Sequence, residues 1–142
     1  MNMIKSLAMT LAAILCVSSF SLHANVIKFL PDIDLPSVGY LTIHNKSDKD
    51  FEIYRVKSND FRKVELHQSV TKNGRTSMQK LEKLKIPANH EIKLEPSGIH
   101  LMLFEPKHKL QHNHEIPIYF FDENNNEVFK TVLTLKNRTK EG

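Results

Sequence analysis

The sequence of 142 residues contains a single cysteine, Cys16, which lies in an apolar N-terminal segment. Residues 1–24 have the pattern of a signal peptide: Lys5 precedes a short apolar run, and Ala24 offers a small residue for cleavage. We therefore predict cleavage near Ala24, export to the periplasm and a mature chain, 25–142, without cysteine. Such a chain has no disulfide, and it has no thiolate for metal binding or catalysis.

Cys16 has one alternative role, as the lipid-modified cysteine of a lipoprotein. The preceding residue, Leu15, is bulky at a place where a small residue is expected. We therefore favour a cleaved signal peptide over lipidation.

Other absences limit the class of protein further. No second long apolar run follows the first, so no membrane span is expected in the mature chain. The 20 Lys and Arg residues are interspersed with 16 Asp and Glu residues instead of forming a basic stripe, which argues against a nucleic-acid partner. No nucleophile stands in a recognisable arrangement with a base, so we expect that the protein is not an enzyme.

What the sequence does contain is a series of short alternating segments rich in β-branched and aromatic residues, separated by turn residues. This pattern predicts one all-β domain over 25–142, a Greek-key β-sandwich or small barrel. The expected strands are 38–45, 51–56, 62–70, 90–96, 97–104, 116–122 and 127–136, with 80–89 as a connection.

The mature chain has only two methionines, and both have unusual neighbours. Met78 lies in the polar segment "RTSMQK". Met102 lies two residues after His100 in "IHLMLF", where strand alternation puts both side chains on the face opposite Leu101. Core methionines usually fill gaps among apolar side chains, which is not the setting of either residue.

The dipeptide Asn73-Gly74 predicts a two-residue hairpin turn. In that register Met78 faces Ser69, and His67 is its diagonal neighbour on the same face, about 7–8 Å away along the backbone. A fold that joins this hairpin to the segment around His100 would gather two imidazoles and two thioethers. Such a neutral, partly soft ligand set favours Cu(I) over zinc, calcium or magnesium.

The spacing of these residues resembles the motif of the periplasmic copper chaperones of the PCu(A)C type. Ten residues separate His67 from Met78, twenty-one separate Met78 from His100, and "HLM" completes the motif with Met102. The segments "GYLTIHNKSDKD", "VELH", "LKIPANHEIKLEPSGIHLMLF" and "IPIYFFDENNNEVF" resemble the family as well, so the resemblance covers roughly 38–136.

This resemblance implies a cupredoxin-like β-sandwich that holds Cu(I) with His67, Met78, His100 and Met102. It also implies delivery of copper to the copper-bearing subunit of cytochrome c oxidase, or to another periplasmic copper protein, by a chain that we expect to be a monomer. Two departures stand out. Residues 25–37 lack the expected Trp-containing segment, which puts the first strand in doubt, and there is no tail rich in His and Met.

Two alternatives to a copper chaperone remain at this point. A copper-sequestering or resistance protein would bind the same ion without passing it on. A secreted β-sandwich interaction module would carry the motif by chance and bind no metal.

Two other groups of residues invite a functional interpretation. His108, His112 and His114 lie close together in a predicted loop and could bind a second ion, although a solvated turn is the simpler interpretation. The lysines Lys80, Lys83 and Lys85 are expected to form a solvated face, with a docking patch for an acidic partner as the lesser alternative.

Overall fold

The computed structural model describes residues 25–29 and 35–137, which form strands and loops and no helix. The expected signal peptide, 1–24, lies outside the described residues. The strands are β1 Val26–Phe29, β2 Ser37–His44, β3 Phe51–Ile53, β4 Arg55–Ser58, β5 Phe61–Lys72, β6 Arg75–Lys80, β7 Leu84–Ile86, β8 Glu91–Leu94, β9 Ile99–Pro106, β10 Glu115–Phe121 and β11 Glu127–Asn137. The predicted all-β class is confirmed. In these described ranges no helix is long and apolar enough to span a membrane.

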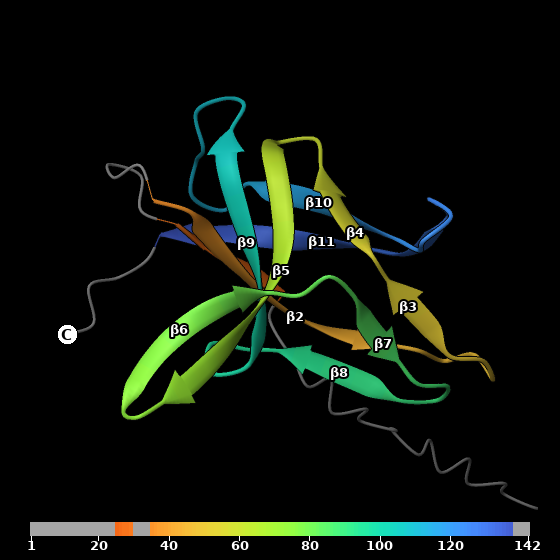
Figure 1. Ribbon diagram of the computed structural model, residues 1–142. Coiled ribbons are helices and arrows are strands. Elements are labelled where there is room, and N and C mark those ends of the chain that lie inside the picture. Colours follow the sequence, from red (N-terminus) through yellow and green to blue (C-terminus); the bar gives the residue numbers. More distant parts are fainter. Residues whose placement is uncertain (1–24, 30–34, 138–142) are drawn as a thin grey trace, which may run out of the picture.

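The strand pairings close into a ring. β1 pairs with β2, β2 with β9, β9 with β5, β5 with β4, β4 with β10, β10 with β11, and β11 returns to β1. Only the β1–β11 pairing in this ring is parallel. Figure 1 shows β5 and β9 side by side, crossing in front of β10 and β11. The result is a sandwich whose two layers are joined at their edges.

Alternation along the strands builds the core between the layers. In β9, Leu101 and Leu103 are buried on one side, while Met102 and Phe104 are half-buried on the other. Both layers of the sandwich contribute apolar side chains to the core in this way. The largest fully buried side chains are those of Phe61, Phe120, Ile27, Ile43, Ile53, Ile86, Leu101, Leu103, Ile116, Ile118, Leu133 and Leu135. The buried residues form one continuous core from β1 to β11.

The expected strand at 51–56 is wrong in one respect, because it breaks at Tyr54. Ile53 and Val56 are both buried although they are three residues apart, and a single strand returns to the same face only at even spacings. The chain therefore bends, so that β3 pairs with β7 and β4 pairs with β5 and β10.

The expected connection at 80–89 contains a short strand, β7. Leu84 and Ile86 are buried while Lys85 between them is exposed, which is the alternation of a half-buried strand. The doubtful first strand also forms: Ile27 and Phe29 of β1 are buried against the core.

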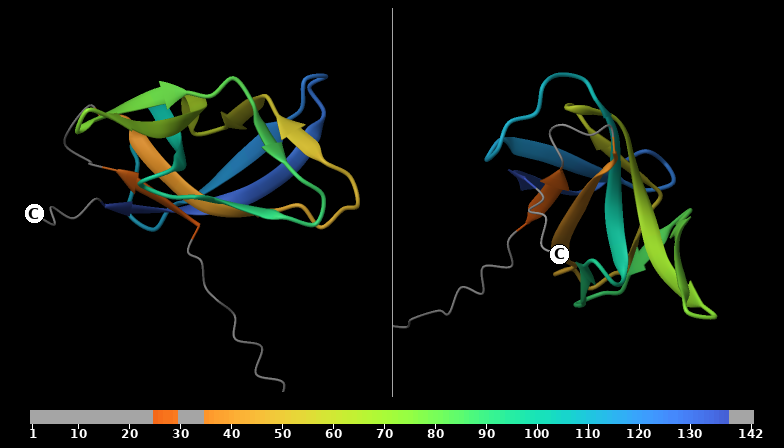
Figure 2. Two further views of the ribbon diagram at one scale, coloured as in Figure 1. Left: turned by 60° about the horizontal axis from the view of Figure 1, so that its bottom comes forward. Right: turned by 90° about the vertical axis from the view of Figure 1, so that its left-hand side faces the viewer.

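The hairpin of β5 and β6 turns at Asn73 and Gly74, whose φ angles of 50° and 73° suit a two-residue turn. The predicted register is confirmed, since Ser69 lies opposite Met78. Figures 1 and 2 show this hairpin projecting from the body of the sandwich. Every residue of β6 is exposed, so the hairpin is an arm held at its base by the strands beneath it.

Candidate metal centre

The four predicted ligands lie on one face of three adjacent strands, β6, β5 and β9. His67 on β5 lies directly opposite His100 on β9. Met78 on β6 lies opposite Ser69, two residues along β5 from His67. Met102 follows His100 by two residues on β9, so it points to the same side of the sheet. Residues 33 positions apart in the sequence thus come together through the β5–β9 pairing.

The two imidazoles face each other, with ring centroids 6.3 Å apart and planes inclined at 35°. His100 is only 1% exposed. His67 Nδ1 and His100 Nε2 are both buried without any hydrogen-bond partner. Buried polar atoms almost always have partners, so two unpartnered ring nitrogens on neighbouring imidazoles indicate a place for a ligand that accepts lone pairs.

The remaining nitrogen of each ring is fixed by a protein acceptor. His100 Nδ1 donates to the Gly98 carbonyl at 3.1 Å, and His67 Nε2 donates to Glu65 Oε2 at 2.9 Å. Metal-binding histidines typically use their second nitrogen in this way, with a carbonyl or carboxylate as acceptor.

Electrostatics keep the inner imidazole neutral. Burial lowers the pKa of His100 below its ordinary value and outweighs the opposing hydrogen bond to Gly98. The hydrogen bond from His67 lowers the pKa of the Glu65 carboxyl, assisted by the charges of Lys63 and Lys80. A neutral imidazole retains the lone pair that a metal requires.

The two methionines differ in their surroundings. Met78 is 53% exposed on the hairpin arm. Met102 is half-buried in β9, where it lies opposite Glu65 of β5 on one side and Val38 of β2 on the other. Thioethers are soft, neutral ligands that suit Cu(I). The Met102 sulfur therefore belongs to the body of the sandwich, and the Met78 sulfur belongs to an arm that extends into solvent.

The LpqE-like family model matches residues 23–132 of the sequence. The chain belongs to the LpqE-like family. The uncharacterized protein RP573 of Rickettsia prowazekii (strain Madrid E) is 29% identical over 103 residues, which are 71% of this chain and 57% of that protein. The chain thus spans a little over half the length of this relative.

Solved structures share the fold of this LpqE-like chain. The copper-bound PCuAC domain from PmoF2 superimposes with a TM-score of 0.61 at 17% identity, covering 80% of this chain and 88% of that domain. The Cu(I) form of DR1885 from Deinococcus radiodurans gives a TM-score of 0.61 at 21% identity over 80% of this chain and 75% of that protein. The resemblance to PCu(A)C proteins is confirmed at the level of fold, the cupredoxin-like β-sandwich.

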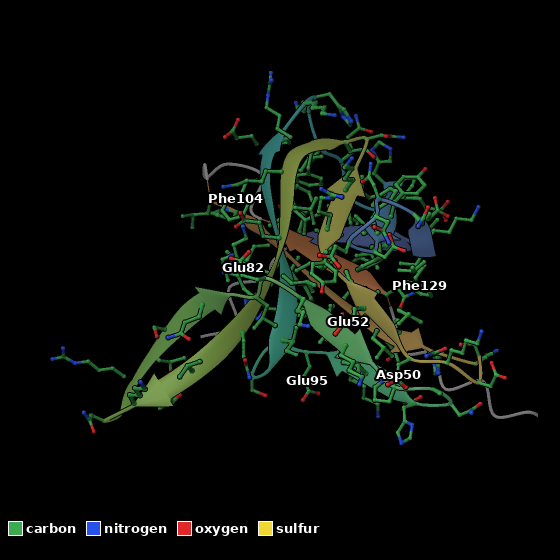
Figure 3. The ribbon with its side chains drawn as sticks, turned by 45° about the vertical axis from the view of Figure 1, so that its right-hand side comes forward. Asp50, Glu52, Glu82, Glu95, Phe104 and Phe129 are labelled. Atoms are coloured by element: carbon green, nitrogen blue, oxygen red, sulfur yellow. The ribbon has the colours of Figure 1, made fainter. Side chains whose placement is uncertain are left out.

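Sequence reasoning about this LpqE-like chain missed two groups that contact the histidines. Glu65 precedes His67 by two residues, so strand alternation alone places both on one face. The Gly98 carbonyl could not be recognised in this way, because only the turn before β9 aims it at His100. Phe104, labelled in Figure 3, extends the same face: its ring centroid is 6.3 Å from that of His67.

The histidines of the 108–114 loop do not form a comparable centre. His108 and His114 have ring centroids 5.8 Å apart, while His112 Nδ1 accepts a hydrogen bond from the Asn137 amide. His108 Nε2 contacts Asp60 Oδ1 at 2.6 Å, and this hydrogen bond raises the pKa of His108. In the part of the chain that the structure describes, no three His, Cys, Asp or Glu side chains are grouped to hold an ion.

The lysines considered as a docking patch are engaged in ion pairs within the LpqE-like chain. Lys83 Nζ lies 3.0 Å from Glu52 Oε1, and Lys85 Nζ lies 2.8 Å from Asp50 Oδ2 across the β3–β7 pair. Figure 3 labels both acidic partners. These pairs favour the solvated face over an acidic-partner surface.

Proposed function

We propose that this protein binds one Cu(I) ion with His67, Met78, His100 and Met102. The observation that carries the proposal is the pair of buried, unpartnered nitrogens on the facing imidazoles of His67 and His100. Metal–imidazole bonds are about 2.0 Å long. Rings whose centroids are 6.3 Å apart therefore leave room for one ion between them.

The chemistry of the donors supports Cu(I) over other ions. Two thioethers and two neutral imidazoles bring no charge, which suits a monovalent soft ion better than zinc or calcium. The solved relatives add weight, since one is a copper-bound PCuAC domain and another is a Cu(I) form of DR1885.

We infer that the protein is an exported chaperone that passes copper on. Removal of residues 1–24 as a signal peptide would place the single domain, 25–142, in the periplasm. The graded exposure of the ligands supports transfer, because Met78 is 53% exposed while His100 is almost completely buried. An acceptor can replace the exposed thioether of Met78 first and the buried imidazole of His100 last, without redox chemistry on the ion.

The acceptor proposed here is the copper-bearing subunit of cytochrome c oxidase or another periplasmic copper protein. A copper-sequestering protein is the second candidate, since its ligand set would be the same. Exposure of Met78 favours the chaperone, because storage is served better by ligands that are all buried. An interaction module without metal would leave the two unpartnered nitrogens unexplained.

Anaerobic competition with a chromophoric Cu(I) chelator tests the proposal. We expect one tightly bound equivalent in the purified protein, lost in the double variant Met78→Leu, Met102→Leu. His90→Gln, at an exposed histidine away from the site, serves as the matched control and should bind as the unaltered protein does. Absence of binding above background would refute the copper site.

Transfer to a copper-free acceptor domain separates delivery from storage. The chaperone proposal predicts that copper leaves the loaded protein faster when acceptor is added than by dilution alone. Sequestration predicts that the acceptor stays empty while copper remains bound.

A further inference from the structure

Glu65 lies beside the proposed copper site and has no place in the proposed ligand set. Its Oε2 is 2.9 Å from His67 Nε2. The side chain is only 18% exposed although it is a carboxylate. A half-buried carboxylate of this kind needs strong hydrogen-bond partners, and His67 is the partner at the shortest distance.

The contact determines which nitrogen of His67 carries a proton. An ionised carboxylate only accepts hydrogen bonds, so the proton between the two groups belongs to His67 Nε2. His67 Nδ1 is buried with no acceptor in reach. A second proton there would be buried without a partner, which costs free energy, so Nδ1 carries a lone pair.

His100 has the opposite arrangement. The Gly98 carbonyl accepts from Nδ1, which leaves the lone pair on the buried Nε2. The two histidines thus present lone pairs from different ring positions. The backbone carbonyl of Gly98 sets the tautomer of His100. The side chain of Glu65, which can be substituted, sets the tautomer of His67.

We propose that Glu65 is a positioning residue that selects the Nε2–H tautomer of His67, so that copper is bound through Nδ1 of His67 and Nε2 of His100. This inference rests on the proposed function for its copper-binding part. The tautomer itself is a property of the copper-free protein and can be measured without the metal.

Two lysines lie near the other carboxylate oxygen of Glu65. Lys63 Nζ lies 3.9 Å and Lys80 Nζ 3.6 Å from Glu65 Oε1, which leaves Oε2 for His67. Lys80 belongs to β6 and follows Met78 by two residues, so Glu65 also links the body of the sandwich to the arm. Both lysines are about half exposed, and each pair alone contributes little.

The tautomer test uses protein labelled with nitrogen-15 in histidine and long-range proton–nitrogen correlation spectra. In the copper-free protein we expect His67 as the Nε2–H form and His100 as the Nδ1–H form. In Glu65→Leu, which keeps the bulk and removes the acceptor, His67 should become a mixture while His100 stays unchanged. Glu65→Gln retains an acceptor oxygen and should restore the single form.

Copper affinity provides the second readout. Loss of a group that orients a metal ligand typically lowers affinity about 10–100-fold, which we expect for Glu65→Leu and not for Glu65→Gln. Glu91→Leu, beside the exposed His44, is the matched control and should leave copper affinity unchanged.

Two results would overturn the proposal: an unaltered His67 tautomer in Glu65→Leu, or unaltered Cu(I) affinity in that variant. The His100 signals report whether Glu65→Leu is folded, and Glu65→Ala replaces it if they are lost. If the unaltered protein bound no Cu(I), the proposed function would fail, whereas the tautomer comparison would still decide the role of Glu65.

Discussion

Gly39 on β2 lies directly opposite Leu101 on β9, and the two residues are in close contact. A Cβ atom at Gly39 would lie 3.1 Å from Leu101 Cβ and 3.3 Å from the Cδ1 atoms of Leu101 and Leu133. Leu101 stands between His100 and Met102 in the sequence. The lack of a side chain at Gly39 therefore sets how deeply β9 packs and where two of the proposed ligands point.

Gly39→Ala should destabilise the protein because Leu101 and Leu133 are both completely buried and have little room to move. Overpacking of this kind typically costs about 1–3 kcal/mol. Urea unfolding measures the loss. Gly98→Ala is the matched control: its nearest atom, Glu95 Cγ, is 3.5 Å away, and we expect a change within about 0.5 kcal/mol. Equal effects of the two substitutions would contradict the proposed tight contact.

His100→Leu should abolish Cu(I) binding while leaving the copper-free protein about as stable as before. The substitution removes a buried nitrogen without a partner, and the Gly98 carbonyl keeps the Ser69 amide as donor at 3.1 Å. We expect the free energy of unfolding to change by less than about 1 kcal/mol, against about 2–5 kcal/mol lost in Leu101→Ala on the same strand. A loss in His100→Leu as large as in Leu101→Ala would show that the imidazole serves the packing of the core.

Met78→Leu and Met102→Leu should each weaken Cu(I) binding, by at least about tenfold or 1.4 kcal/mol, but differ in the rate of copper transfer. If the exposed Met78 is displaced first, its removal leaves a position open to the acceptor. Stopped-flow transfer to a Cu(I) chelator should then be accelerated more in Met78→Leu than in Met102→Leu. The reverse order would mean that Met102 exchanges first. Because Met78 is 53% exposed, its replacement should not alter the unfolding midpoint.

The contact between His108 and Asp60 should make stability depend on pH. The hydrogen bond that His108 donates to Asp60 raises the pKa of His108 above 6.5, so protonation favours the folded state. This contribution is fully present below about pH 6.5, the unfolded value, and is lost as the pH rises through the higher folded value. The NMR titration midpoint of His108 should therefore lie above 6.5 and fall in Asp60→Asn.

The difference in unfolding midpoint between the unaltered protein and Asp60→Asn isolates this effect. It should shrink as the pH rises from about 6.5 through the higher folded-state pKa of His108, because His108 loses its proton over that range. A constant difference would show that no proton is linked to the contact, and a difference that grew with pH would contradict the raised pKa of His108.

Much of the fold could be predicted because alternation and turn residues are local. The Asn73-Gly74 turn fixes the register that puts Ser69 opposite Met78, and "IHLMLF" assigns its two faces without reference to the rest of the chain. The break at Tyr54 was missed, because a bend needs the knowledge that Ile53 and Val56 are both buried. Burial depends on which strands pair, and those pairings join distant segments.

The sequence by itself determined the proposed donor atoms, two imidazoles and two thioethers at fixed spacings, and hence the class of metal that we propose. Only the tertiary structure decided that His67 lies opposite His100, that Met78 extends on an exposed arm and that Glu65 and Gly98 fix the two imidazoles. The donor chemistry of a side chain depends only on which residue occupies the position. The burial that leaves two ring nitrogens without partners depends on the pairing of β5 and β9 over a common core.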